Sequence, residues 1–322
     1  MRNKKKGIIV LALLFLLLGL LLGLTLIKRF VDNGEGESYY QCDYIYNDEQ
    51  YNEKENLKLI LFVGLDSYDN EIVDSYRNSE LADCDVLLVL NEDDKTILPI
   101  QINRDTMCDY NILAIGGRIA GVENGQLALS HSYGSGDIAS LVNTKDAISN
   151  ILTGINIDYY ASLPMEAVGK VNDLAGGITV YVEDDFSMVD PSIPQGVDYT
   201  LHGNQALTFV RARNGVDDNT NLSRMNRQRV YLRALFEKSK ELVSEDPNFV
   251  ASTMNSIGGY LIANTDIYGL SDLANTLLKY ELLDAVQLKG EAKVGSEGYM
   301  EYHLNPSEVE KFCIDTFYTK VE

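Results

Sequence analysis

Six arginines gathered in one stretch of an acidic chain are the residues best suited to chemistry. Residues 209–233 hold these six arginines, no lysine and two acidic side chains, although the whole chain has a formal net charge of -21. Arg211 and Arg213 stand two apart in a segment that we expect to be extended, and they therefore share a face. Arg224 and Arg227 share a face because they stand three apart on an expected helix. Both pairs together suggest a polyanion site, because the planar guanidinium matches phosphate oxygens, although an exposed helix face with salt bridges would also explain them.

Acidic side chains are predicted to gather near a further arginine. The apolar runs on either side of the polar turn NEDDK predict a hairpin whose paired residue numbers sum to 187, which places Asp83 opposite Arg104. The preceding apolar strand ends at Asp66. If that strand runs antiparallel to the first hairpin strand, Asp66 and Asp105 lie at the same end of the sheet as this pair.

Carboxylates beside a phosphate site suggest a bound cation. Mg²⁺ typically takes one or two carboxylates together with phosphate oxygens. Asp66 and Asp83 therefore suggest a magnesium-assisted phosphoryl or pyrophosphoryl site, with Asp85 as a rival to Asp83. The competing interpretation is that these aspartates only end strands, as aspartates often do.

Composition excludes several other classes of function. The chain has no G-x-S-x-G, Walker glycine loop, G-x-G-x-x-G or H-E-x-x-H motif. Three histidines and no C-x-x-C make a zinc site improbable, and the pairing of Cys42, Cys84, Cys108 and Cys313 stays open. Nucleic-acid binding is not expected, because it requires a basic surface.

The N-terminal residues predict a membrane anchor. Ile8 to Ile27 is an apolar run long enough to span a bilayer, preceded by the basic residues of a short tail at 1–7. Four basic residues precede the run and two follow it, which favours a cytoplasmic N-terminus, single-pass insertion in the cell membrane and an extracellular remainder. A cleaved signal peptide is the alternative, but the run is long for one and no Ala-x-Ala-like site follows. Without these six residues, 21 basic side chains face 48 acidic ones, or -27.

The remainder predicts a flexible acidic linker and one folded domain. Residues 28–56 are polar, acidic and rich in tyrosine, as in a tether. From residue 57 to 322, apolar strands alternate with amphipathic helices, including a long helix at about 222–243. This alternation predicts an α/β fold in which helices cover a mixed sheet.

Eight segments in order resemble one known family. They are LFVGLDS (61–67), AD with its following strand (82–90), INRDT (102–106), HSYGSG (131–136), GINIDYY (154–160), DLAGGITVYV (173–182), LHGNQALTFVRAR (201–213) and RMNRQR (224–229). In this order they are similar to the LytR-CpsA-Psr family of cell-wall glycopolymer transferases. The resemblance covers roughly residues 57–242, and the tail is similar to an extension seen in some members.

The resemblance implies a three-layer α/β/α sandwich with a mixed central sheet outside the cell. It implies a phosphotransferase that uses Mg²⁺ to move a polyprenyl-pyrophosphate-linked anionic glycopolymer, of teichoic acid or capsule type, onto a peptidoglycan hydroxyl. Polyprenyl phosphate would be released. A hydrophobic tunnel between the sheet and a helical layer would hold the lipid, although apolar residues at helical spacing more often form plain core.

The resemblance also implies roles for individual residues. Asp66 and Asp83 would hold the metal. The pyrophosphate would be surrounded by five arginines, supported by Gln228: Arg104, Arg211, Arg213, Arg224 and Arg227. The residues expected to act in catalysis are Arg104, Asp105, Arg211 and Arg213, where Asp105 either orients Arg104 or serves as a general base.

Two departures from the family pattern keep other functions open. Tyr68 stands where members often have an arginine, for which Arg77 is a possible substitute. Asn221 stands where an acidic residue is expected, with Asp217 and Asp218 as possible stand-ins. The alternatives are a lipid-pyrophosphate hydrolase and a non-catalytic regulatory protein that binds polyprenyl pyrophosphate.

Overall fold

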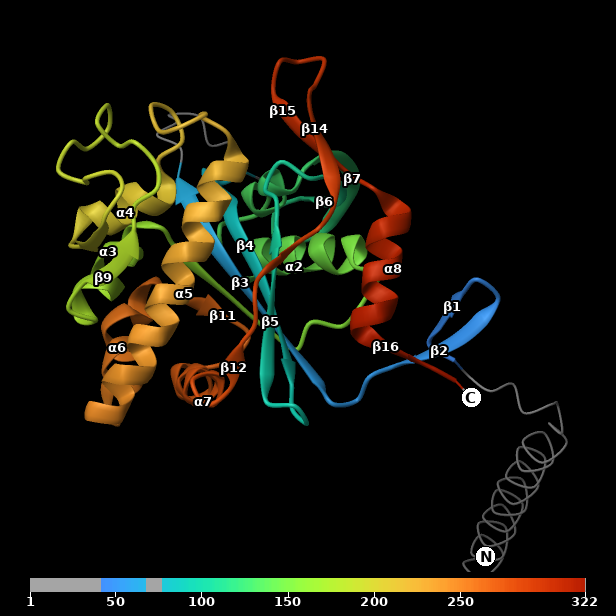
Figure 1. Cartoon of the computed structure of the whole chain (residues 1–322). Coiled ribbons are helices and arrows are strands. Elements are labelled where there is room, and N and C mark those ends of the chain that lie inside the picture. The colour runs from blue at the N-terminus through green and yellow to red at the C-terminus, as the bar shows by residue number, and fades with distance from the viewer. Residues whose placement is uncertain (1–41, 68–76, 322) are drawn as a thin grey trace, which may run out of the picture. The chain divides into compact units, whose positions relative to one another are not determined.

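The computed structural model describes residues 42–67 and 77–321 (Figure 1). The predicted membrane segment at 8–27 and residues 28–41 of the predicted linker lie outside this part of the chain. None of the helices in the described ranges is long and apolar enough to cross a membrane. Two compact units are distinguished, and Lys54–Tyr318 form the larger one.

The smaller unit corrects the prediction of a flexible linker that reaches residue 56. Its described part is a three-stranded sheet in the order β1-β2-β16, made of β1 (Tyr44–Tyr46), β2 (Glu49–Glu53) and β16 (Tyr318–Lys320). Asn47 and Asp48 form the turn between β1 and β2 with φ values of 51° and 64°, and such left-handed residues suit a two-residue hairpin. The hairpin signal lies in YIYNDEQY, which composition alone reads as a tether.

A mixed sheet forms the centre of the larger unit, as predicted. Its order is β11-β8-β3-β4-β5-β12, and β13 also pairs with β5. The strands are β3 (Leu57–Ser67), β4 (Glu80–Asn91), β5 (Thr96–Ile102), β8 (Tyr159–Pro164), β11 (Ile262–Ala263), β12 (Glu281–Leu282) and β13 (Val286–Gln287). β3 pairs parallel with β8 and antiparallel with β4, and β5 pairs parallel with β12. The predicted hairpin register is confirmed, because Asp85 pairs with Ile102.

Helices cover the central sheet on both sides, which gives the expected three layers. The helices of the larger unit are η1 (Leu127–Ser132), α2 (Ile138–Ile151), α3 (Glu166–Leu174), α4 (Asn204–Arg211), α5 (Asn221–Glu245), α6 (Phe249–Ile257), η2 (Gly258–Tyr260), α7 (Ile267–Leu277) and α8 (Pro306–Phe317). Figure 1 shows α2 on one side of the sheet and α5 with α7 on the other. On the α5 side, Gln101 of β5 donates to the Met225 carbonyl at 3.2 Å.

Three two-stranded sheets flank the central sheet. They are β6 (Met107–Leu113) with β7 (Ile119–Gln126), β9 (Ile178–Tyr181) with β10 (Asp198–Leu201), and β14 (Gly290–Val294) with β15 (Met300–Leu304). β15 reaches the turn that follows β5, because the Tyr302 amide donates to the Asp105 carbonyl at 2.7 Å. The C-terminal extension is therefore part of the wall around Asp105.

An apolar core beside the central sheet supports the end of α4. It joins β9, β10, α4 and α5, and Phe186 stacks on Phe209 with ring centroids 5.6 Å apart. Phe209 lies in the last turn of α4, two residues before Arg211. This core therefore fixes the segment that carries Arg211 and Arg213.

Replacing Phe186 with alanine is expected to destabilise the larger unit. Phe186 is fully buried, so Phe186→Ala removes an aromatic ring from a packed core and should lower the free energy of unfolding by about 3–5 kcal/mol. Urea denaturation of the full-length chain in detergent, followed by circular dichroism, measures this change. Met188→Ala is the matched control, because Met188 is 84% exposed and should change stability little.

Candidate active site

A bulge in β4 turns Asp83 toward α5. Gly64 pairs with Cys84 and Leu65 with Ala82, so Asp83 is left without a partner on β3. In a regular strand, side chains two residues apart lie on the same face. Here Asp83 contacts Arg224 of α5, whereas Asp85 lies on the opposite face with its partner Ile102. The extra residue of the bulge accounts for this difference.

Two arginines hold the buried carboxylate of Asp83. Arg104 forms an ion pair with Oδ1, and Nη1 of Arg224 lies 2.6 Å from Oδ2. Asp83 is 2% exposed and Arg224 is 5% exposed. The predicted encounter of Asp83 with Arg104 is therefore present in the structure. A buried carboxylate stays ionised only when such partners replace its hydration.

Asp105 lies next to this cluster and is also buried. Its Oδ1 lies 3.5 Å from Nε of Arg104 and accepts a 3.3 Å hydrogen bond from Gln126 Nε2. Burial raises the pKa of Asp105, while the positive charges of Arg104, Arg213 and Arg224 act in the opposite direction. Arg104 thus contacts this carboxyl group, and the charges of Arg213 and Arg224 lie near enough to act on it.

Arg211 ends α4, and Arg213 lies in the loop just beyond it. The prediction of an extended segment is therefore wrong for Arg211. The segment is helical because Ala206, Phe209 and Val210 give it a buried apolar face, and Arg211 is the last residue of this helix. Arg211 forms a bidentate pair with Asp66, with Nε 3.0 Å from Oδ2 and Nη2 2.6 Å from Oδ1.

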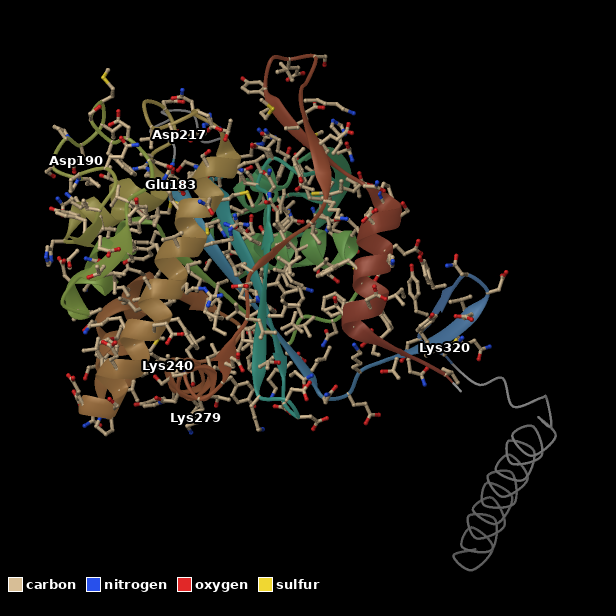
Figure 2. All side chains as sticks on the ribbon, viewed as in Figure 1. Glu183, Asp190, Asp217, Lys240, Lys279 and Lys320 are labelled. Carbon is tan, nitrogen blue, oxygen red and sulfur yellow. The ribbon has the colours of Figure 1, made fainter. Side chains whose placement is uncertain are left out.

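Arg213 extends from the loop after α4. Its side chain is exposed, and no residue in the described ranges forms an ion pair with it. Figure 2 shows the acidic side chains of Glu183 and Asp217 at the end of the larger unit where α5 begins.

Arg227 is buried, and its guanidinium nitrogens are taken up by contacts within the protein. It is 3% exposed, and its Nε donates to the Phe209 carbonyl at 2.9 Å. The two terminal nitrogens contact the Ala212 carbonyl and Asp184. Gln228 accepts from Gln101 at 3.1 Å and donates to the Val210 carbonyl at 3.3 Å. Both side chains therefore hold the C-terminal end of α4 onto α5.

Two of the carboxylates at this end of the sheet are those predicted to hold a divalent cation, and each is paired with arginine. Asp66 and Asp83 lie on neighbouring strands, because Asp66 pairs with Leu81. Two carboxylates match the number that Mg²⁺ usually takes from a protein beside phosphate. Within the described ranges, no group of three or more His, Cys, Asp or Glu side chains is arranged to hold a metal ion. Asp85 is fully buried, and burial raises its pKa to about 8, which disfavours its charged form.

The possible substitutes for missing family residues have other partners. Arg77 donates to the Tyr133 hydroxyl and lies 3.9 Å from Glu123. Asp218 accepts from the Ser223 hydroxyl at 2.7 Å, at the start of α5. Tyr68 lies outside the described residues. In place of an acidic residue, Asn221 accepts from Nε of Arg224 at 3.1 Å.

Sequence reasoning missed the residues that hold the arginines in place. Asn103, Gln126 and Asp184 contact the site without belonging to a recognisable pattern. Asn103 could have been found, because it directly precedes Arg104 in a turn, where asparagine commonly accepts from the backbone two residues later. Gln126 and Asp184 carry no comparable signal.

The chain is thus an α/β protein with an arginine–aspartate cluster at one end of a mixed sheet. The model of the LytR_cpsA_psr family matches residues 33–315. The chain therefore belongs to the LytR-CpsA-Psr family.

Individual relatives agree with this assignment. The chain is 27% identical over 202 residues to the "Cell wall biosynthesis protein LcpA" of Corynebacterium glutamicum, which is 55% of this chain and 38% of that protein. The match thus spans under two fifths of that relative's length. A structure of TagT bound to LIIa-WTA is similar with a TM-score of 0.60 and 21% identity, over 81% of this chain and 90% of that one. TagV of B. subtilis (TM-score 0.60, 20% identity, 82% and 98% coverage) and Lin1025 of Listeria innocua (0.55, 25%, 82% and 97%) share the fold.

The buried His131 in η1 gives the larger unit a specific pH dependence. Burial lowers the pKa of His131 to about 4, although Glu80 lies 3.8 Å from Nδ1 and Asp137 opposes the shift. Between about pH 6.5 and 4 the unfolded chain therefore binds a proton that the folded chain does not, so stability is lost as the pH falls, by about 1.4 kcal/mol per unit.

Urea denaturation across this pH range tests the role of His131. The difference in unfolding free energy between the original chain and His131→Leu should change with pH at this rate and level off above about pH 6.5. His202→Gln, at an exposed histidine, is the matched control. A difference for His131→Leu that does not vary with pH would contradict this account.

Proposed function

We propose that the protein is a membrane-anchored transferase of cell-wall biosynthesis. It moves a polyprenyl-pyrophosphate-linked anionic glycopolymer onto a peptidoglycan hydroxyl outside the cell and releases polyprenyl phosphate. The observation that carries this proposal is the contact of Arg104 and Arg224 with the buried Asp83, next to Asp105. Membership of the family and the relative named for cell wall biosynthesis support it.

The arginines balance the negative charge of the transferred phosphoryl group. A pyrophosphate in this site meets Arg213, which has no ion-pair partner among the described residues, and the exposed Arg211 beside it. Phosphoryl transfer spreads negative charge over the equatorial oxygens, and positioned guanidinium groups stabilise that charge in the transition state. Arg227 and Gln228 contribute indirectly by fixing the end of α4.

Asp105 is the proposed acceptor of the proton. The acceptor hydroxyl attacks the phosphorus that bears the sugar, the bond to the bridging oxygen breaks, and polyprenyl phosphate leaves with the bonding electrons. The hydroxyl proton passes to Asp105, whose raised pKa makes it a stronger base than an ordinary carboxylate. Gln126 and Arg104 orient its Oδ1.

Asp66 and Asp83 would hold the Mg²⁺. A bound Mg²⁺ supplies neutralisation of the pyrophosphate oxygens beside these carboxylates. Before it binds, Asp66 is neutralised by Arg211, and Asp83 by Arg104 and Arg224. The same arginines thus balance the charge of the carboxylates in the absence of other cations.

An exposed aromatic ring in the central sheet suits the lipid part of the substrate. Phe62 is 37% exposed in the middle of β3, whereas its neighbours Leu61 and Val63 are almost fully buried. Phe62 pairs with Val86, and Val86 with Gln101, so all three side chains lie on the face toward α5. The proposed polyprenyl tunnel therefore lies between this face and α5.

Removal of Arg213 tests the transferase directly. Arg213→Ala should lower the rate of polyprenyl phosphate release and sugar attachment about 100-fold or more, because one transition-state donor is lost. The fold should be unaffected, since Arg213 has no ion-pair partner in the described ranges. The assay uses the full-length chain in detergent with a synthetic polyprenyl-pyrophosphoryl sugar, Mg²⁺ and peptidoglycan fragments. Chelation of Mg²⁺ should also abolish turnover.

The control and the product analysis separate the alternatives. Arg233→Ala removes an exposed arginine of α5 that pairs with Asp284, and its activity should stay near that of the original chain. Lipid phosphate release at the same rate without acceptor would instead establish a hydrolase. Lipid binding without any turnover would establish a binding protein.

A further inference from the structure

The amide of Asn221 holds the Arg224 guanidinium in the site. Its Oδ1 accepts from Nε at 3.1 Å and from Nη2 at 2.5 Å, while Nη1 of Arg224 reaches Asp83. Its Nδ2 donates to Oδ1 of Asn103 at 2.7 Å. We propose that Asn221 and Asn103 form a pair of positioning residues that orients Arg224 for the pyrophosphate without adding negative charge. This inference rests on the proposed function.

The hydrogen-bond directions make the two asparagines depend on each other. Arg224 can only donate, so Asn221 must present its oxygen to Arg224 and its nitrogen to Asn103. The Asp105 amide also donates to Oδ1 of Asn103, at 2.9 Å, so this oxygen receives two donors. A carboxylate at 221 could not donate to it, and two oxygens would then face each other in a buried position.

The pair connects the two elements that carry the charged residues. Asn103 is 4% exposed in the turn after β5, and Asn221 is 7% exposed in the first turn of α5. Arg104 and Asp105 directly follow Asn103 in the chain. One buried hydrogen bond between the asparagines therefore fixes Arg224 relative to Arg104 and Asp105.

A neutral acceptor has an electrostatic consequence for the ligand. An acidic residue at 221 would hold the same guanidinium but would place a further negative charge beside the arginines. A like charge within a few ångströms of a bound pyrophosphate opposes its binding. The asparagine thus combines a fixed arginine with a stronger positive field than an aspartate would give.

Calorimetric titration with inorganic pyrophosphate and Mg²⁺ tests the pair on the full-length chain in detergent. Asn221→Asp should raise the dissociation constant roughly tenfold or more. Asn226→Asp is the matched control, because Asn226 accepts from Arg229 at 3.1 Å with the same three-residue spacing on the same helix. It should leave the dissociation constant within about twofold.

A double variant separates charge from hydrogen bonding. Asn221→Asp alone should lower the melting temperature by roughly 3 °C or more, because its carboxylate faces Oδ1 of Asn103. Asn103→Ala removes that conflict but also the acceptor of the Asp105 amide, so the comparison is a cycle: Asn221→Asp should cost less stability in the Asn103→Ala background than in the original chain. Pyrophosphate binding should stay weak in the double variant, which is also titrated if the single variant does not fold.

The outcomes distinguish this inference from the proposed function. Equal dissociation constants for Asn221→Asp and Asn226→Asp would overturn the electrostatic role of Asn221. An equal loss of stability from Asn221→Asp in the original chain and in the Asn103→Ala background would overturn the coupling to Asn103. If the folded original chain does not bind pyrophosphate at all, the proposed function falls, and this inference with it.

Discussion

The site depends on one buried carboxylate shared by two guanidinium groups. Asp83 is 2% exposed, and burying an isolated charge costs several kcal/mol or more. Arg104 and Arg224 offset that cost. Because one comes from the turn after β5 and the other from α5, both elements must be in place. The ionised cluster therefore forms only in the complete fold, where its partners are held within a few ångströms.

Several other features hold Asp83 and its two arginine partners in place. The bulge in β4 turns Asp83 toward α5, and the hydrogen bond between Asn103 and Asn221 fixes the two elements that supply its partners. Arg227 uses its charge to hold the end of α4, which brings Arg211 beside Asp66. An acidic chain thus keeps four of these arginines in place because each pairs with a carboxylate: Arg104, Arg211, Arg224 and Arg227.

The sequence predicted those parts of the site that local pairing determines. The β4–β5 hairpin follows from two apolar runs and a polar turn, so the register that sets Asp83 near Arg104 could be calculated. The class of the fold follows from the alternation of strands and helices. The prediction of an extended segment at Arg211 is wrong, because Ala206, Phe209 and Val210 follow the apolar spacing of a helix.

Contacts between distant elements could not be predicted in this way. The direction of the Arg227 side chain depends on carbonyl groups at the end of α4, which helical spacing on α5 does not reveal. The contact of Gln126 with Asp105 depends on how β7 approaches the β5 turn. Such arrangements arise from packing, and a single sequence gives no local signal for them.

A crystal structure of the chain with Mg²⁺ and a non-cleavable, methylene-bridged polyprenyl diphosphate analogue tests the central claim most directly. The account predicts phosphonate oxygens within about 2.7–3.2 Å of the Arg104 and Arg213 side chains, with the cation bound by Asp66 and Asp83. A diphosphate bound elsewhere, with Asp83 still enclosed by Arg104 and Arg224, would contradict it.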